Sequence, residues 1–183
     1  MPEFVADEPQ GDWYIMSREG GRLYSRPFGT LASYSVRELP VNAAVLVLDF
    51  EDGSARVAMM KGSVSIPGIL EVDDRVEVDG DTAKILGPTE LRTPSMMGWK
   101  DDGRPNPLRA YQTMFECEGG ETLRITDRFE ASGRRWVLVE PPKEASLFVR
   151  GSEIRPASAE EIAAILAPPA LSLIHISEPT RPY

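Results

Sequence analysis

The chain has few side chains that could support catalysis, metal binding or cross-linking. Its 183 residues include one cysteine, Cys117, and one histidine, His175. A single cysteine cannot form a disulfide within the chain, and one cysteine with one histidine cannot form the four-ligand cluster of a structural zinc site. We therefore expect no disulfide scaffold, no metal centre and no bound cofactor.

Basic residues are also scarce relative to acidic ones. Lysine and arginine together number 20, against 29 aspartates and glutamates, which gives a net charge of −9. Nucleic-acid binding draws most of its affinity from cationic side chains that neutralise phosphates. The charge balance therefore argues against DNA or RNA as a partner.

Long apolar runs are absent as well. No run reaches the roughly 18 residues of a membrane-spanning helix, so we expect no integral membrane segment. Residues 1–11 contain carboxylates and lack the apolar core of a secretory signal, which predicts a disordered N-terminus. A sequence fragment can begin downstream of a signal peptide, so this pattern leaves export open.

Short extended segments separated by turn residues make up most of the chain. Residues 43–50 form an apolar, β-branched run, Asp52 and Gly53 suit a tight hairpin turn, and residues 55–59 supply the answering strand. Further strands are expected at residues 23–27, 63–66, 75–78, 89–92, 111–118, 122–129, 136–139, 146–150 and 154–156. Such short strands form stable structure when the sheet curls into a small barrel.

The order of strands and turns recurs at an offset of about 70 to 80 residues, which is longer than a solenoid or propeller repeat. We therefore predict an all-β fold with two tandem barrels, at residues 12–80 and 81–157. A terminal helix is expected over residues 158–167, because Ser158 and Glu161 form a capping box before a run of helix formers. We expect this helix either to pack on the second barrel or to lead into the part of the protein that the fragment has lost.

The C-terminal segment has a different origin. Residues 171–181 (LSLIHISEPTR) resemble the translation of a transposase-type sequencing-library adapter. We therefore expect residues 168–183 to form a disordered, artefactual tail, and the natural portion to end near Ala170 within a longer protein. His175 then leaves the set of candidate functional residues.

The two predicted barrels resemble bacterial SH3-type (SH3b) domains, in tandem as in envelope proteins of planctomycete-like bacteria. Residues 23–27 (LYSRP) match the family's first element, residues 45–48 its long strand, and residues 135–139 (RWVLV) its tryptophan-containing strand. Residues 141–145 (PPKEA) resemble the loop before the last strand in such proteins. The first copy departs from the pattern, because residues 56–57 lack the tryptophan of that third strand.

The resemblance implies two SH3-like barrels and a non-catalytic binding module of the bacterial cell envelope or periplasm. Its partner would be a protein, a peptide or a cell-wall polymer. An alternative is the targeting half of a truncated cell-wall hydrolase whose catalytic domain is missing. A third alternative, a cytoplasmic adaptor, follows from the lack of a visible signal peptide.

Aromatic side chains near the predicted loops are the candidate ligand-binding residues, because flat rings hold an extended peptide or a glycan at little entropic cost. The alternative is that these rings belong to the barrel core, as we expect for Trp136. The candidates are Trp99, Tyr34, Tyr24, Phe28 and Tyr111.

No catalytic residue is predicted. A reactive thiolate needs a neighbouring base or cation, and the natural segment has no histidine, so we expect Cys117 to be a buried structural residue. Adjacent carboxylates at residues 51–52, 73–74 and 101–102 lack the spacing of a calcium loop and are interpreted as solvated turns.

Overall fold

The computed structural model describes residues 10–17, 21–60, 62–96 and 104–168. In these residues the chain forms fourteen strands in two sheets and one short α-helix, so the all-β prediction is confirmed. The strands are β1 (Asp12–Met16), β2 (Gly21–Tyr24), β3 (Ser35–Leu39), β4 (Ala44–Glu51), β5 (Ser54–Ala58), β6 (Gly68–Glu71), β7 (Val76–Asp79), β8 (Thr82–Ile85), β9 (Thr89–Arg92), β10 (Thr113–Cys117), β11 (Thr122–Ala131), β12 (Arg134–Val139), β13 (Ser146–Arg150) and β14 (Ile154–Pro156).

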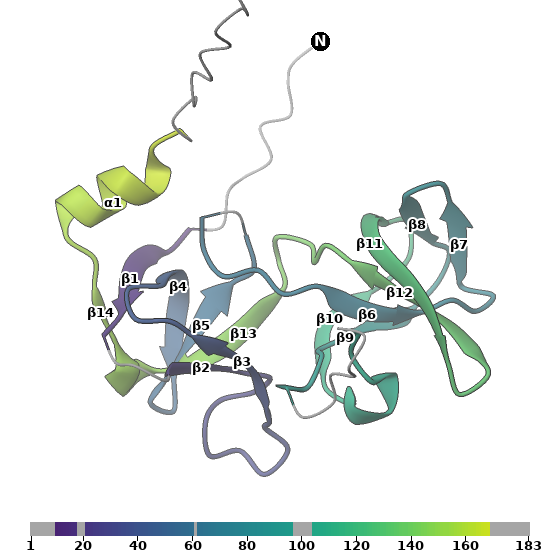
Figure 1. The fold of residues 1–183 in the computed structure, drawn as a ribbon, viewed down its shortest axis with the longest axis horizontal. Helices are drawn as coiled ribbons and strands as arrows, with labels where there is room; N and C mark the ends of the chain where they lie inside the picture. The colour runs from purple at the N-terminus through teal and green to yellow at the C-terminus, as the bar shows by residue number, and fades with distance from the viewer. Residues whose placement is uncertain (1–9, 18–20, 61, 97–103, 169–183) are drawn as a thin grey trace, which may run out of the picture.

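Each sheet has seven antiparallel strands and occupies its own side of the molecule (Figure 1). Sheet one has the order β14-β1-β4-β5-β13-β2-β3, and sheet two the order β10-β9-β6-β12-β11-β8-β7. Sheet one therefore ends in the free edges of β14 and β3, and sheet two in those of β10 and β7.

The sheets do not follow the predicted boundaries at residues 12–80 and 81–157. Strands β6 and β7 belong to sheet two, whereas β13 and β14 return to sheet one. All seven strands of sheet two therefore lie in the sequence between β5 and β13. A repeating order of strands and turns marks where strands begin and end, but it does not identify their partners.

The burial and pairing of strand β13 explain why the chain returns to sheet one after it has formed sheet two. Its central residues are buried, and it pairs with β5 through Leu147 opposite Val57 and with β2 through Phe148 opposite Tyr24. An apolar strand of this kind is stable when both of its edges are paired and both faces are covered. Sheet one supplies both neighbours.

Turn chemistry sets the hairpins. Asp52 and Gly53, between β4 and β5, both have positive φ values, 48° and 74°, as a two-residue type I′ turn requires.

The strand expected at residues 63–66 is not formed. The Ser63 N–H closes a turn by donating to the Met60 carbonyl at 3.1 Å, and the Ser63 hydroxyl accepts from the backbone N–H of Leu46 at 3.0 Å.

Apolar side chains from both sheets form one continuous buried cluster, which includes Val57 and Leu147 from sheet one and Leu91 from sheet two. A smaller cluster on sheet two surrounds Trp136, which is buried as predicted. Removing this apolar surface from water is the main stabilising contribution.

Helix α1 (Ala159–Leu166) begins at the predicted capping box. The Ser158 hydroxyl accepts from the Glu161 N–H at 3.2 Å, and the Glu161 carboxylate accepts from the Ser158 N–H at 2.8 Å. The prediction that this helix packs on the second barrel is wrong. It follows β14 of sheet one, and Ile165 approaches Gly62 beside Trp13 of β1.

Trp99 and residues 169–183 of the tail predicted at 168–183 lie outside the described residues. Among the residues that are described, no helix has the length and apolar character needed to cross a membrane.

Candidate functional site

Three of the five candidate aromatic residues, Tyr24, Phe28 and Tyr34, line one groove of 370 Å³, which we call the aromatic groove. Its walls come from the end of β2, the loop between β2 and β3, the start of β3 and the segment after β9. The other lining residues are Arg22, Gly29, Thr30, Ser33, Ser35, Ser95 and Met96.

Hydrogen bonds within sheet one fix the loop that carries these rings. The Ser25 N–H donates to the Tyr34 carbonyl at 3.0 Å, and the Ser25 hydroxyl accepts from the Tyr34 N–H at 3.1 Å. The Phe28 N–H donates to the hydroxyl of Ser54, a buried residue of β5, at 2.8 Å. The groove is therefore preformed by backbone contacts and does not depend on loop packing alone.

Tyr24 and Phe28 form an aromatic pair with one buried and one accessible ring. Their centroids are 5.3 Å apart in an edge-to-face arrangement, a geometry that aromatic quadrupoles favour. The guanidinium of Arg150 lies 3.5 Å from the Phe28 centroid and 5.7 Å from that of Tyr24. Tyr24 is 7% exposed whereas Phe28 is 46% exposed, so Phe28 is the ring that a ligand can contact.

Tyr34 lines the groove and its hydroxyl also joins the two sheets. It donates to the Thr93 carbonyl at 2.6 Å and accepts from the Gln112 N–H at 3.2 Å. The Gln112 side chain in turn accepts from Arg26 at 2.8 Å. Burial raises the pKa of Tyr34 to about 12, which keeps the phenol neutral and able to donate.

Tyr111 packs edge-on against the ring of Tyr34, with centroids 4.9 Å apart. It is largely exposed and is not among the residues that line the groove. The structure therefore places Tyr111 beside the junction of the two sheets, next to the aromatic groove.

Two hydroxyls in the groove wall, those of Tyr24 and Ser95, have no hydrogen-bond partner within the described part of the chain. Tyr24 and Ser95 are each 7% exposed, and both line the groove. No carboxylate is found among the described lining residues, although the whole chain is acidic. Arg22 and Ser95 were not identified from the sequence, since neither belongs to a pattern and Ser95 reaches the groove from a segment about 60 residues away from Tyr34.

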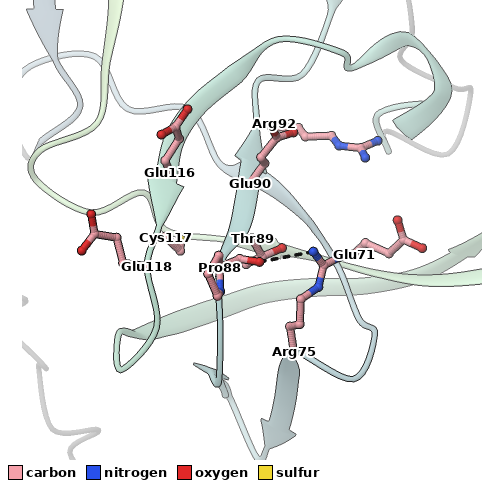
Figure 2. A pocket seen from close by; sticks show the side chains of 9 residues that line it. All are labelled: Glu71, Arg75, Pro88, Thr89, Glu90, Arg92, Glu116, Cys117 and Glu118. Carbon is pink, nitrogen blue, oxygen red and sulfur yellow. Dashed lines mark hydrogen bonds between the residues drawn. The ribbon is translucent and has the colours of Figure 1, made fainter.

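A second hollow, which we call the charged pocket, lies on sheet two and measures 650 Å³ (Figure 2). Four carboxylates and two guanidiniums line it, together with three other residues. The lining residues are Glu71, Arg75, Pro88, Thr89, Glu90, Arg92, Glu116, Cys117 and Glu118.

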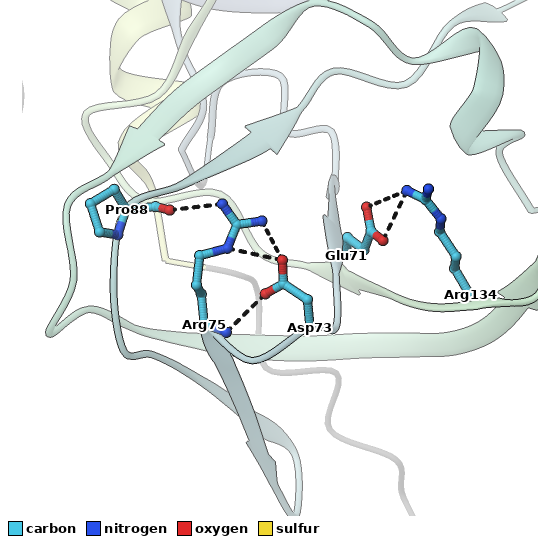
Figure 3. A network of polar contacts seen from close by, with 5 residues as sticks. All are labelled: Glu71, Asp73, Arg75, Pro88 and Arg134. Atoms are coloured by element: carbon cyan, nitrogen blue, oxygen red, sulfur yellow. Dashed lines mark hydrogen bonds and ion pairs between the residues drawn. The ribbon is translucent and has the colours of Figure 1, made fainter.

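Two of the charged lining residues, Arg75 and Glu71, form ion pairs within sheet two (Figure 3). Arg75 donates to the carboxylate of Asp73 and to the carbonyl of Pro88, the latter at 3.2 Å. The Arg75 hydrogen bond lowers the pKa of Asp73 below its usual range. Arg134 donates to both carboxylate oxygens of Glu71, at 3.1 and 3.2 Å. Two of the six charged lining residues, Arg75 and Glu71, are thus paired with residues outside the lining.

Cys117 does not provide a nucleophile in the charged pocket. It is 2% exposed, and burial, with a smaller effect of Glu121, raises the pKa of its thiol to about 11. Only the thiolate is an effective nucleophile, so at neutral pH the side chain is unreactive. The predicted burial of Cys117 is confirmed.

The two hollows therefore differ in chemistry: the charged pocket is lined mainly by charged side chains, whereas the aromatic groove offers an exposed ring and hydroxyls. No group of three or more potential ligand side chains suited to a metal ion occurs in the described ranges. No protein-family model matches the chain, and no curated protein or solved structure is similar to it.

Proposed function

We propose that this protein is a non-catalytic binding module and that its ligand occupies the aromatic groove. The observation that carries the proposal is the pair of unpartnered hydroxyls of Tyr24 and Ser95 in the wall of a preformed groove. A hydroxyl can both donate and accept a hydrogen bond. A ligand that pairs with both hydroxyls exchanges their bonds with water for two directional hydrogen bonds inside the groove.

The exposed ring of Phe28 supports the same proposal. It lies beside the two hydroxyls and is held by its backbone bond to Ser54 and by the Arg150 guanidinium. Ligand sites typically combine apolar or aromatic walls with a few fixed polar groups. A rigid ring of this kind provides contact area at a low entropic cost.

The proposal extends to the fold and the location. Each curled sheet is an SH3-like barrel, with the second barrel inserted into the first between β5 and β13. The module acts at the bacterial cell envelope, and its ligand is an envelope protein, a peptide or a cell-wall polymer. Support comes from the short strands, four pairs of which contain a register shift, and from the aromatic loop between β2 and β3, which resembles the first long loop of SH3b domains.

Retention on two defined matrices tests the proposal. Purified protein is passed over isolated peptidoglycan and over immobilised envelope proteins, in parallel with Phe28→Ala and with Leu86→Ala. Leu86 is an exposed apolar residue directly after β8 that lies outside both hollows, so it is a matched control.

We expect retention on one matrix, a loss of at least about tenfold in Phe28→Ala, and no change in Leu86→Ala. A tenfold change in affinity corresponds to roughly 1.4 kcal/mol of binding free energy. The loss of one aromatic contact at an interface typically costs about that much. Retention on neither matrix, or equal retention of all three proteins, would contradict the proposed function.

A further inference from the structure

The aromatic groove continues onto a free strand edge. Met96 lines the aromatic groove and also a neighbouring hollow of 490 Å³, whose other walls are Val36, Arg37 and Glu38 of β3. Strand β3 is the last strand of sheet one, and β2 is its one strand partner among the residues that the structure describes. The groove and the edge of β3 therefore form one continuous surface.

The free edge of β3 has hydrogen-bonding capacity that a second strand can use. In an antiparallel ladder, alternate residues direct their N–H and C=O groups away from the neighbouring strand. On β3 these groups face outward, since β2 occupies the opposite edge. An extended peptide that adds to such an edge gains affinity from main-chain hydrogen bonds and specificity from pockets for its side chains.

Charge along this surface favours an acidic occupant. Arg22 in the groove and Glu38 on β3 pair with each other at 3.2 Å, so their charges cancel. Arg37 is exposed on β3 and has no ion-pair partner in the described residues, which leaves one uncompensated positive charge along this edge. Guanidinium groups bind carboxylates through strong, charge-assisted hydrogen bonds.

We propose that the ligand is an extended, acidic peptide segment of a partner protein that adds an eighth strand to sheet one beside β3. This inference rests on the proposed function and names the class of ligand. The peptide backbone pairs with the outward groups of β3, and its carboxylates face Arg37. One of its side chains enters the aromatic groove beside Phe28, where Tyr24 and Ser95 supply hydroxyls.

Strand addition distinguishes a peptide from a glycan, because a glycan lacks the regular N–H and C=O groups that a strand edge requires. The probe is a fluorescein-labelled peptide of ten residues in which Thr and Glu alternate around one central Leu. A matched peptide has Lys in place of each Glu. One further copy of the Glu peptide is N-methylated at its odd positions and another at its even positions. Each pattern removes the N–H donors along one edge of the extended peptide and leaves those along the other edge intact.

Fluorescence anisotropy measures the dissociation constants. We expect the Glu peptide to bind at least about tenfold more tightly than the Lys peptide, because carboxylates replace ammonium groups next to Arg37. One N-methylated copy should lose at least about tenfold, and the other should stay within about twofold, since a single edge pairs with β3. Arg37→Glu should weaken binding about tenfold, whereas Arg135→Glu, an exposed residue of sheet two, should leave it unchanged.

Equal binding of the Glu and Lys peptides, or equal losses in the two methylated copies, would overturn strand addition at β3. Absence of peptide binding together with retention on peptidoglycan that Phe28→Ala abolishes would also overturn it, while the proposed function would stand. If no peptide binds and neither matrix retains the protein, the proposed function and strand addition at β3 are both overturned.

Discussion

Replacement of Tyr34 by phenylalanine tests how the two sheets are joined. The substitution keeps the ring and its packing on Tyr111, but it removes the hydroxyl between Thr93 and Gln112. The Thr93 carbonyl and the Gln112 N–H then lose a partner at a half-buried site. A net hydrogen bond is worth about 1 kcal/mol, and an unsatisfied buried group costs about 1 to 3 kcal/mol, so we expect a loss of about 2 kcal/mol in the free energy of unfolding.

Urea denaturation followed by tryptophan fluorescence measures this loss, and for a chain of this size the melting temperature should fall by about 4 to 8 °C. Tyr111→Phe is the matched control, because the Tyr111 hydroxyl is exposed and makes no hydrogen bond with the described residues. That variant should stay within about 0.5 kcal/mol of the parent protein. Equal stability of the parent and Tyr34→Phe proteins would refute the bridging role.

Three further outcomes are expected. The phenol of Tyr34, with a pKa raised to about 12, should ionise later than the usual value near 10 in a titration followed at 295 nm, and its stabilising effect should be complete below pH 10 and lost between pH 10 and 12. Cys117 should react with a thiol reagent at pH 8 at a rate that rises at least about 100-fold in denaturant, and fast reaction of the native protein would contradict its burial. Gly68→Ala should lower stability by about 1 to 3 kcal/mol, because the added Cβ would lie 2.4 Å from the Leu91 side chain, whereas Gly87→Ala, with 3.9 Å to its nearest neighbour, should be neutral in the same urea assay.

Local features of the fold could be predicted because they depend on neighbouring residues. The hairpin around Asp52 and Gly53 follows from a two-residue turn that needs positive φ values, and the capping box of Ser158 and Glu161 follows from a spacing of three residues. Strands such as β3 (SVREL) and β8 (TAKI) were missed, since they are short and mix polar with apolar residues without a long alternation.

Pairing partners could not be predicted in the same way. Strand β13 lies about 90 residues from β5 in the sequence, and nothing in its composition distinguishes a return to sheet one from a last strand of sheet two. Register in such strands depends on which apolar face meets the core, and several partners satisfy that condition. The predicted tandem division therefore differed from the observed insertion.

The candidate site also combines features that depend on neighbouring residues with features that depend on long-range contacts. Tyr24 and Phe28 are close in sequence, so their shared location was accessible to pattern analysis. The bridging role of Tyr34 and the position of Ser95 depend on the segment after β9, which the fold alone brings to the β2–β3 loop. Long-range contacts of this kind leave no periodic signal in the sequence.

Binding through the aromatic groove is tested most directly by hydrogen exchange with mass spectrometry, in the presence and absence of the matrix component that retains the protein. We expect slower amide exchange in residues 24–35 and in residues 95–96 when the ligand is present, with little change around the charged pocket at residues 88–90 and 116–118. Slower exchange confined to the charged pocket, with residues 24–35 unchanged, would contradict binding at the aromatic groove.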